Sequence, residues 1–323
     1  MHLRHHASWS PSHSYLAGME YALAGSAEAA HALPINVVLA FDDSYAAHGA
    51  AVIASAARYM QAGSARFLCL HDGIPHSRRE QVEASAPGFE FIWREVTDAE
   101  MPPMVTRGHI NRITLFRLGL GKFAPPDWQR VIYLDSDIVV QADLRDLWSV
   151  DLNGAPIGAV ADVYQDGRKL QAQLSLPDEA EPRYFNAGVL LIDLEMERQS
   201  SGLAKSLDLL IARNFDLEFL DQDALNAAFW NRWAPISPAW NVQRYCRKAD
   251  PVRHGWTPYR QAAIIHFITS DKPWTRSVWH PWAGSYWRAL ARTPFTDEVI
   301  ERYKVRWRDL MRIRLRYWIS HVL

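Results

Sequence analysis

The chain has little cysteine: only Cys69 and Cys246 occur among its 323 residues. So few thiols exclude a disulfide framework and predict a protein of a reducing compartment. The chain also lacks an unbroken apolar run of about 18 residues, the length that a membrane-spanning helix needs. Its N-terminal stretch carries histidine and polar residues where a signal peptide has an apolar core. We therefore expect a cytoplasmic protein without a spanning helix.

Two glycine-rich signatures are missing as well. Neither a Gly-x-Gly-x-x-Gly sequence nor a Walker-type loop occurs, and this disfavours a dinucleotide or ATP site of the usual kind. The formal net charge of −1 disfavours a nucleic-acid-binding protein. What is present, 49% apolar and 22% charged residues, is typical of a globular protein. The length allows one large α/β domain or two modest ones.

Short apolar runs alternate with helical patterns along much of the chain. The runs predict buried strands at residues 35–41, 65–71, 89–93, 130–134, 157–160 and 184–193. The patterns between them predict helices at residues 46–60, 77–84, 109–118 and 143–148. This rhythm indicates a mostly parallel sheet with right-handed crossovers. Residues 163–183 are polar and lack a pattern, so we expect a loop there, of the length that commonly forms a lid.

The run at 130–134 leads directly into Asp135-Ser136-Asp137. Open α/β sheets bind ligands at the carboxyl ends of their strands, and paired carboxylates there suit Mg²⁺ or Mn²⁺. In the alternative interpretation Asp135 caps a turn and Asp137 faces water, because acidic turns are common. Taken alone, the motif favours the turn.

Other segments also place polar side chains next to an apolar run. They are Asp42-Asp43-Ser44, Asn186-Ala187-Gly188, Asp221-Gln222-Asp223, and His266 followed by Lys272-Pro273-Trp274. Structural alternatives exist for each: helix capping for Asp43, Ser44 or Asp221, a glycine bulge at Gly188, and a structural core or surface histidine at His266. Gly188 would otherwise let the backbone approach a ligand closely.

In this order, from Ile35 to Trp274, the segments resemble those of the retaining, nucleotide-sugar-dependent glycosyltransferases of family 8. That family includes bacterial lipo-oligosaccharide galactosyl- and glucosyltransferases and glycogenin. The resemblance implies a GT-A fold, with a mostly parallel central sheet flanked by helices. It implies a UDP-sugar donor, UDP-glucose or UDP-galactose, whose diphosphate is held by Mn²⁺ or Mg²⁺. The hexose would pass with retention to a glycan or glycolipid hydroxyl in lipopolysaccharide or other surface-polysaccharide synthesis.

The resemblance assigns roles to residues of this sequence. The implied metal ligands are Asp135, Asp137 and His266. The implied donor-binding residues are Ala40, Asp42, Ser44, Arg117, Asp135, Ser136, Asn186, Asp221, Thr269 and Lys272. The implied catalytic residues are Asp162, Asp221 and Gln222. Arg117 would reach the sugar and the second carboxylate of the metal motif, Asp162 would line the acceptor pocket, and Lys272 would neutralise the diphosphate.

Two positions depart from the family pattern. Ser44 stands where the family usually has Asn, and Thr269 stands where it usually has Gly. These departures leave open a non-catalytic protein that binds carbohydrate or nucleotide sugar and retains the fold. A metal-dependent hydrolase is a further alternative. The presence of all three implied metal ligands favours a transferase.

The ends of the chain differ from its middle. We expect residues 1–33, with His2, His5, His6 and His13, to be a poorly ordered extension, and residues 34–274 to form the GT-A domain. Residues 275–323 would be a basic, aromatic helical extension.

One predicted helical face in this C-terminal extension comprises Ile300, Tyr303, Trp307, Leu310, Met311 and Trp318. Seven Arg or Lys residues against one acid between 302 and 316 suit peripheral contact with the anionic inner face of the cytoplasmic membrane. Packing of this helix on its own domain is the alternative.

Overall fold

The computed structural model describes residues 33–101, 112–246, 256–258, 261–268, 272–275, 280 and 282–322, with side chains of the last helix described to residue 315. The unit discussed below begins at Ile35. The predicted histidine-rich extension and Thr269 lie outside the described residues.

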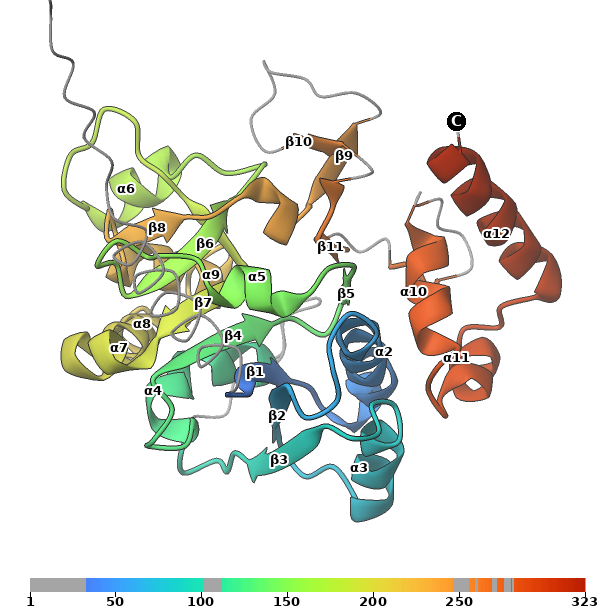
Figure 1. Cartoon of the computed structure of the whole chain (residues 1–323). Coiled ribbons are helices and arrows are strands. Elements are labelled where there is room, and N and C mark those ends of the chain that lie inside the picture. The colour runs from blue at the N-terminus through green and yellow to red at the C-terminus, as the bar shows by residue number, and fades with distance from the viewer. Residues whose placement is uncertain are drawn as a thin grey trace, which may run out of the picture. The chain divides into compact units, whose positions relative to one another are not determined.

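A seven-stranded sheet runs through this unit in the order β3-β2-β1-β4-β7-β6-β8 (Figure 1). Its strands are β1 (Ile35–Ala40), β2 (Ala65–His71), β3 (Glu90–Glu95), β4 (Arg130–Leu134), β6 (Ile157–Ala161), β7 (Phe185–Asp193) and β8 (Trp233–Pro235). All neighbouring strands are parallel except that β7 runs antiparallel to both β4 and β6. The prediction of a mostly parallel sheet is therefore confirmed.

Helices lie on both faces of this sheet. The helices of the described residues, not all of which contact the sheet, are η1 (Asp43–Tyr45), α2 (Ala46–Ala57), α3 (His76–Glu83), η2 (Arg112–Gly119), α4 (Leu120–Phe123), α5 (Leu144–Trp148), α6 (Arg168–Leu174), α7 (Leu194–Ser200), α8 (Gly202–Ala212), α9 (Leu220–Ala228), η3 (Pro238–Trp240), α10 (Ala283–Leu290), α11 (Thr296–Arg302) and α12 (Trp307–Val322). Along β1, Val37 and Leu39 join one core cluster with α2 and α10, while Val38 joins another with η2 and α9. Successive side chains of a strand point to opposite faces, so a strand buried on both faces is apolar throughout.

Two small pairings complete the region around the metal motif. β5 (Ile138–Val140) pairs antiparallel with β11 (Ile264–His266), and β9 (Arg244–Cys246) pairs in parallel with β10 (Trp256–Pro258). β5 starts directly after Asp137, and the last residue of β11, His266, lies opposite Ile138. This register brings a residue from late in the chain next to the acidic motif.

Two predicted elements differ in the structure. The stretch 163–183 is not a plain loop, because α6 forms within it after Gly167, whose φ is 80°. Leu170 and Leu174, one helical turn apart, pack with Tyr184 and Trp230, and this small cluster explains the helix. The helix predicted before the metal motif is present from Arg112 onward and is of the 3₁₀ type.

The predicted C-terminal face is also divided. α11 ends at Arg302 and α12 begins at Trp307, with Lys304 at a φ of 51° between them. Ile300, Tyr303 and Leu310 pack against the core, whereas Trp307 and Met311 are exposed, and the side chain at position 318 is outside the described residues. The expectation of one continuous helical face is therefore wrong. Within the described part of the chain, no helix is both long enough and apolar enough to cross a membrane.

Candidate active site

A cleft of about 250 Å³ opens at the carboxyl ends of β1 and β4. Most of the residues to which the resemblance assigns a role line it: Ala40, Asp42, Arg117, Asp135, Ser136, Asp137, Asn186, Asp221, Gln222, His266 and Lys272. Ser44 and Asp162 are not among its lining residues. The side chains thus come from segments far apart in the sequence and converge at the edge of the sheet where α/β proteins bind ligands.

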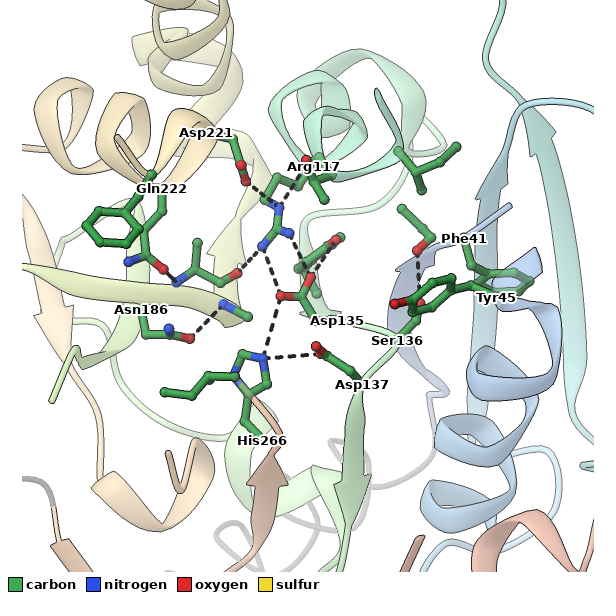
Figure 2. Close-up of a pocket in the computed structure, with 18 of the residues that line it drawn as sticks. Phe41, Tyr45, Arg117, Asp135, Ser136, Asp137, Asn186, Asp221, Gln222 and His266 are labelled. Carbon is green, nitrogen blue, oxygen red and sulfur yellow. Dashed lines mark hydrogen bonds and ion pairs between the residues drawn. The ribbon is translucent and has the colours of Figure 1, made fainter. Parts of the chain in front are cut away.

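Asp135, Asp137 and His266 point toward one another in this cleft (Figure 2). The Nε2 atom of His266 lies 3.2 Å from Oδ1 of Asp137 and 3.9 Å from Oδ2 of Asp135. The backbone strengthens the arrangement, because the N–H of Phe267 donates to the carbonyl of Asp137 at 3.1 Å. One ligand atom from each of the three side chains lies within 4.8 Å of the others.

The chemistry of these side chains fits a divalent cation. Oδ1 of Asp137 is buried and receives no hydrogen bond from the residues that the structure describes, and such an orphaned acceptor is costly unless a cation satisfies it. Burial by itself would raise the pKa of Asp137, but the positive charge of Lys272 opposes it, and this pKa is held well below its ordinary value. Two carboxylates and an imidazole suit Mn²⁺, and Mg²⁺ less well because of the nitrogen.

Gly188 makes room for two of the candidate metal ligands. The pairing of β4 with β7 continues beyond Leu134, so that the N–H of Asp135 donates to the carbonyl of Gly188 at 2.9 Å. A Cβ atom on Gly188 would lie 2.1 Å from Cε1 of His266 and 2.9 Å from Oδ2 of Asp135. The sequence predicts that this glycine admits a ligand, but the structure shows that it first admits the imidazole and the carboxylate.

Arg117 is buried and joins two carboxylates. Its guanidinium contacts Oδ1 of Asp135 at 2.7 Å and Oδ2 of Asp221 at 3.0 Å. It also donates to the carbonyls of Thr114 at 2.9 Å and Ala187 at 2.6 Å. The carboxylate of the metal motif that it contacts is thus the first, Asp135, and not the second as the resemblance implies. Burial raises the pKa of Asp221 to about 6, although Arg117 opposes this shift.

The turn after β1 is held by its own side chains. The carboxylate of Asp42 accepts from the N–H of Tyr45 at 2.9 Å and from the hydroxyl of Ser44 at 2.7 Å. Asp42 is therefore the residue that caps η1, whereas the sequence suggests a capping role for Ser44. The hydroxyl of Ser136 donates to the carbonyl of Ala40 at 2.9 Å and fastens the metal motif to the end of β1.

Gln222 is oriented by contacts at both ends of its amide. Its Oε1 accepts from the N–H of Ala187 at 3.0 Å, and its Nε2 donates to Oδ2 of Asp162 at 3.2 Å. The other oxygen of Asp162 accepts from the backbone N–H groups of Tyr164 and Gln165. Asp162 thus lies behind Gln222 and connects the site to the start of the 163–183 segment.

Sequence reasoning misses two tyrosines that belong to the site. The hydroxyl of Tyr133 donates to Oδ1 of Asp135 at 3.0 Å, and its ring lies 4.7 Å from the guanidinium carbon of Arg117. Tyr133 lies two residues before Asp135, and residues at this spacing in an extended chain point to the same face, so the sequence carried a signal for this contact. Tyr45 also lines the cleft, and burial raises the pKa of Tyr45 to about 12.

Comparison with known proteins agrees with this site. The family model described as glycosyl transferase family 8 matches residues 36–277, which is well over half of the chain. The chain belongs to glycosyl transferase family 8. It is thus a glycosyltransferase, and its family membership agrees with the resemblance that the separate motifs carry.

Relatives in this family differ in length. General stress protein A of Bacillus subtilis strain 168 is 28% identical over 275 residues, which cover 80% of this chain and 94% of that protein. The lipopolysaccharide 1,2-glucosyltransferase of Escherichia coli K12 is 28% identical over 193 residues, which cover 58% of this chain and 56% of that enzyme. The chain therefore spans only about half of the E. coli relative.

Solved structures of the family show the same fold. The structure of an active-site mutant of LgtC superposes with a TM-score of 0.67 at 26% identity, covering 80% of this chain and 96% of that chain. The structure of the galactosyltransferase LgtC in complex with donor and acceptor sugar analogues gives a TM-score of 0.65 at the same identity and coverage. The GT-A type of domain predicted from the motifs is confirmed.

Proposed function

We propose that this family 8 glycosyltransferase is a metal-dependent, retaining hexosyltransferase that uses a UDP-sugar, UDP-glucose or UDP-galactose. Its acceptor is a hydroxyl of a glycan or glycolipid in the synthesis of lipopolysaccharide or another surface polysaccharide. The observation that carries the proposal is the convergence of Asp135, Asp137 and His266 beside Lys272 in one cleft at the end of β1. The LgtC and E. coli relatives, which are named as a galactosyltransferase and a glucosyltransferase, support a hexose donor.

Charge stabilisation of the leaving diphosphate is the main task of this site. A divalent cation held by Asp135, Asp137 and His266 would supply Lewis-acid stabilisation of the negative charge on departing UDP. Lys272 adds a compact positive charge at the same place, since its Nζ lies 2.6 Å from Oδ2 of Asp137. Preorganised positive groups of this kind account for much of an enzyme's acceleration.

Retention is best explained by attack on the face of the sugar that the leaving group occupies. The acceptor oxygen forms the new bond to the anomeric carbon while UDP departs with the old bonding pair and takes up the acceptor proton. A double displacement would need Gln222 as nucleophile, but amides are poor nucleophiles. Its Oε1 already accepts from the N–H of Ala187. Gln222 therefore acts as a positioned side chain beside the anomeric carbon and not as the nucleophile.

Metal-dependent release of UDP tests this function. Purified protein should release UDP from a UDP-hexose with Mn²⁺, stop when the metal is chelated, and resume when Mn²⁺ is restored. Asp135→Asn and His266→Ala should each lower the rate by about 10²-fold or more, because a misplaced or missing ligand removes charge stabilisation at the leaving group. Asp127→Asn, an exposed acid just before β4, is the matched control and should keep full activity.

The same assay separates the alternatives. A transferase releases UDP faster when a glycan acceptor is added, whereas a hydrolase releases it equally fast without one. Saturable binding of UDP with no turnover would indicate a non-catalytic protein. Full activity of both ligand variants would overturn the site assignment. A thermal-shift screen of UDP-sugars with Mn²⁺ then identifies the donor, because a ligand that binds only the native state raises the melting temperature.

We propose in addition that α12 rests on the anionic inner face of the cytoplasmic membrane. Trp307, Met311 and Leu315 are each more than half exposed and follow one another at four-residue intervals, so they form a single apolar stripe. Exposed Arg308 and Arg312 lie beside this stripe. Apolar rings and chains flanked by arginine fit a lipid surface that carries negative headgroups. Contact with lipid would bring the cleft close to a glycolipid acceptor.

Vesicle sedimentation tests this contact. The protein should pellet with phosphatidylglycerol vesicles and stay in solution with phosphatidylcholine vesicles, since each basic residue near an anionic surface contributes about 1 kcal/mol. The double substitution Met311→Glu with Leu315→Glu should lower binding at least about tenfold, because it removes the apolar stripe and repels the headgroups. Ile211→Glu, an exposed apolar residue of α8, is the control and should bind as wild type does. Equal binding by the double variant would contradict the proposal.

A further inference from the structure

We infer that Asn241 is a positioning residue for the metal site: it fixes the tautomer of His266 so that the unprotonated Nε2 faces the two carboxylates. This inference rests on the metal-dependent function proposed above. Asn241 is only 1% exposed, and it follows η3 directly. The bridge between Val242 and Ile265 holds it beside β11. Its Oδ1 lies 3.0 Å from Nδ1 of His266.

The orientation of the neighbouring side-chain amide, that of Asn186, is fixed by one partner that can only donate and another that accepts. Amide oxygen and nitrogen are distinguished only by their partners. The backbone N–H of Gly188, which can only donate, lies 3.0 Å from Oδ1 of Asn186, so this atom is the carbonyl oxygen. At the other end, Nδ2 of Asn186 lies 3.2 Å from a carboxylate oxygen of Asp162, which accepts. Both ends of the Asn186 amide are thus assigned without ambiguity.

Asn186 in turn fixes Asn241. Oδ1 of Asn186, which can only accept, lies 2.8 Å from the side-chain amide of Asn241. The end of the Asn241 amide that faces it is therefore the NH₂ group. The carbonyl oxygen of Asn241 then faces His266, and Nδ1 of His266 carries a proton. In a neutral imidazole the other nitrogen has the lone pair. That nitrogen, Nε2, is the one 3.2 Å from Oδ1 of Asp137.

Metal-binding histidines depend on such a partner. A hydrogen bond on the far nitrogen fixes the tautomer and the ring plane, and loss of the partner costs about 10–100-fold in metal affinity. Without the oxygen of Asn241, the imidazole can place its proton on Nε2 and rotate. The chain of amides also reaches Asp162, which Asn186 and Gln222 both contact. One hydrogen-bonded network therefore connects His266 with Asp162 and, through it, with Gln222.

Mn²⁺ titration calorimetry without nucleotide tests the role of Asn241. Asn241→Leu removes the acceptor but keeps the number and branching of the side-chain heavy atoms, and it should weaken Mn²⁺ binding by about 10–100-fold. Asn241→Asp keeps an oxygen toward Nδ1 and should stay within about threefold of wild type, since a carboxylate serves the same role. Gln243→Leu is the matched control: this amide is buried in the same segment, but its described hydrogen bonds go to Val163 and Ala161. Its affinity should not change.

The outcomes separate the two ideas. Equal Mn²⁺ affinity of wild type and Asn241→Leu overturns the role of Asn241, whereas a wild-type protein that binds no Mn²⁺ overturns the metal site itself. A second measurement uses the wild-type protein, so that the inference can still be tested if Asn241→Leu does not fold. In the imidazole ¹⁵N–¹H correlation spectrum of the Mg²⁺-loaded protein, His266 is assigned by the loss of its signals in His266→Gln. We expect its proton on Nδ1; a proton on Nε2 in protein that binds Mg²⁺ overturns the inference.

Discussion

Gly188→Ala is expected to abolish Mn²⁺ binding and to lower the rate of UDP release by about 10²-fold or more. The added methyl group would lie 2.1 Å from Cε1 of His266 and 2.9 Å from Oδ2 of Asp135, far inside contact distance. The backbones of both neighbours are fixed, because His266 belongs to β11 and the N–H of Asp135 donates to the carbonyl of Gly188 itself. Their side chains must therefore turn away into the cleft and lose the arrangement that holds a cation. A displacement of about 1 Å is enough for such a loss. Calorimetry and the UDP assay measure both effects.

Gly121→Ala provides the control for this substitution. A Cβ atom on Gly121 would meet nothing closer than Oε1 of Glu197 at 3.6 Å, and the residue lies in α4, where alanine is favoured over glycine. Metal affinity and UDP release should remain at the wild-type level. The melting temperature of Gly188→Ala shows whether its fold is intact. A folded Gly188→Ala protein that binds Mn²⁺ normally would mean that His266 is not a ligand in this arrangement.

The sequence predicts where the acidic pair lies because that signal is local, although taken alone the motif favours a turn over a metal site. β4 is an apolar run, and Asp135 stands at its carboxyl end, where parallel strands present their ligands. His266 is different. Its approach to Asp137 depends on the antiparallel register of β11 and β5, which joins residues far apart in the chain. No local periodicity specifies that register, so only the resemblance to a family could place the histidine there.

Other features escape prediction because they depend on which groups meet across the core. The contact of Arg117 with Asp135 is one such feature. The division between α11 and α12 is another. Ile300 and Leu310 both face the core although they lie on different helices, so their apolar spacing looks the same whether or not the helix is broken. A periodic apolar pattern predicts which residues are buried, but it does not predict whether the helix axis changes direction between them.

Arg117→Met is expected to lower the free energy of unfolding by about 3–5 kcal/mol at pH 8.5, because it leaves the buried carboxylate of Asp221 and the partly buried one of Asp135 without their cation. Arg117 is 4% exposed, and its guanidinium contacts both Asp135 and Asp221. Urea unfolding measures the loss. Arg66→Met is the matched control, since the side-chain groups that Arg66 contacts, the amide of Asn36 and the ring of Trp128, are both neutral. Removing Arg66 leaves no unpaired charge, and its cost should stay near 1 kcal/mol.

The pH dependence of this loss identifies the unpaired charge. Burial raises the pKa of Asp221 to about 6 even with Arg117 present, and removal of Arg117 raises it further. A carboxyl group whose pKa is higher in the folded than in the unfolded state destabilises the fold while it is ionised, and the penalty disappears as pH falls through the folded pKa. The gap between Arg117→Met and wild type should therefore narrow between pH 8.5 and pH 6, by at most about 1.4 kcal/mol per pH unit for one proton. Asp221→Asn combined with Arg117→Met should recover part of the stability at pH 8.5 and remove most of this pH dependence. A gap that stays constant with pH, in both the single and the double variant, would show that lost packing and not an uncompensated carboxylate causes the defect.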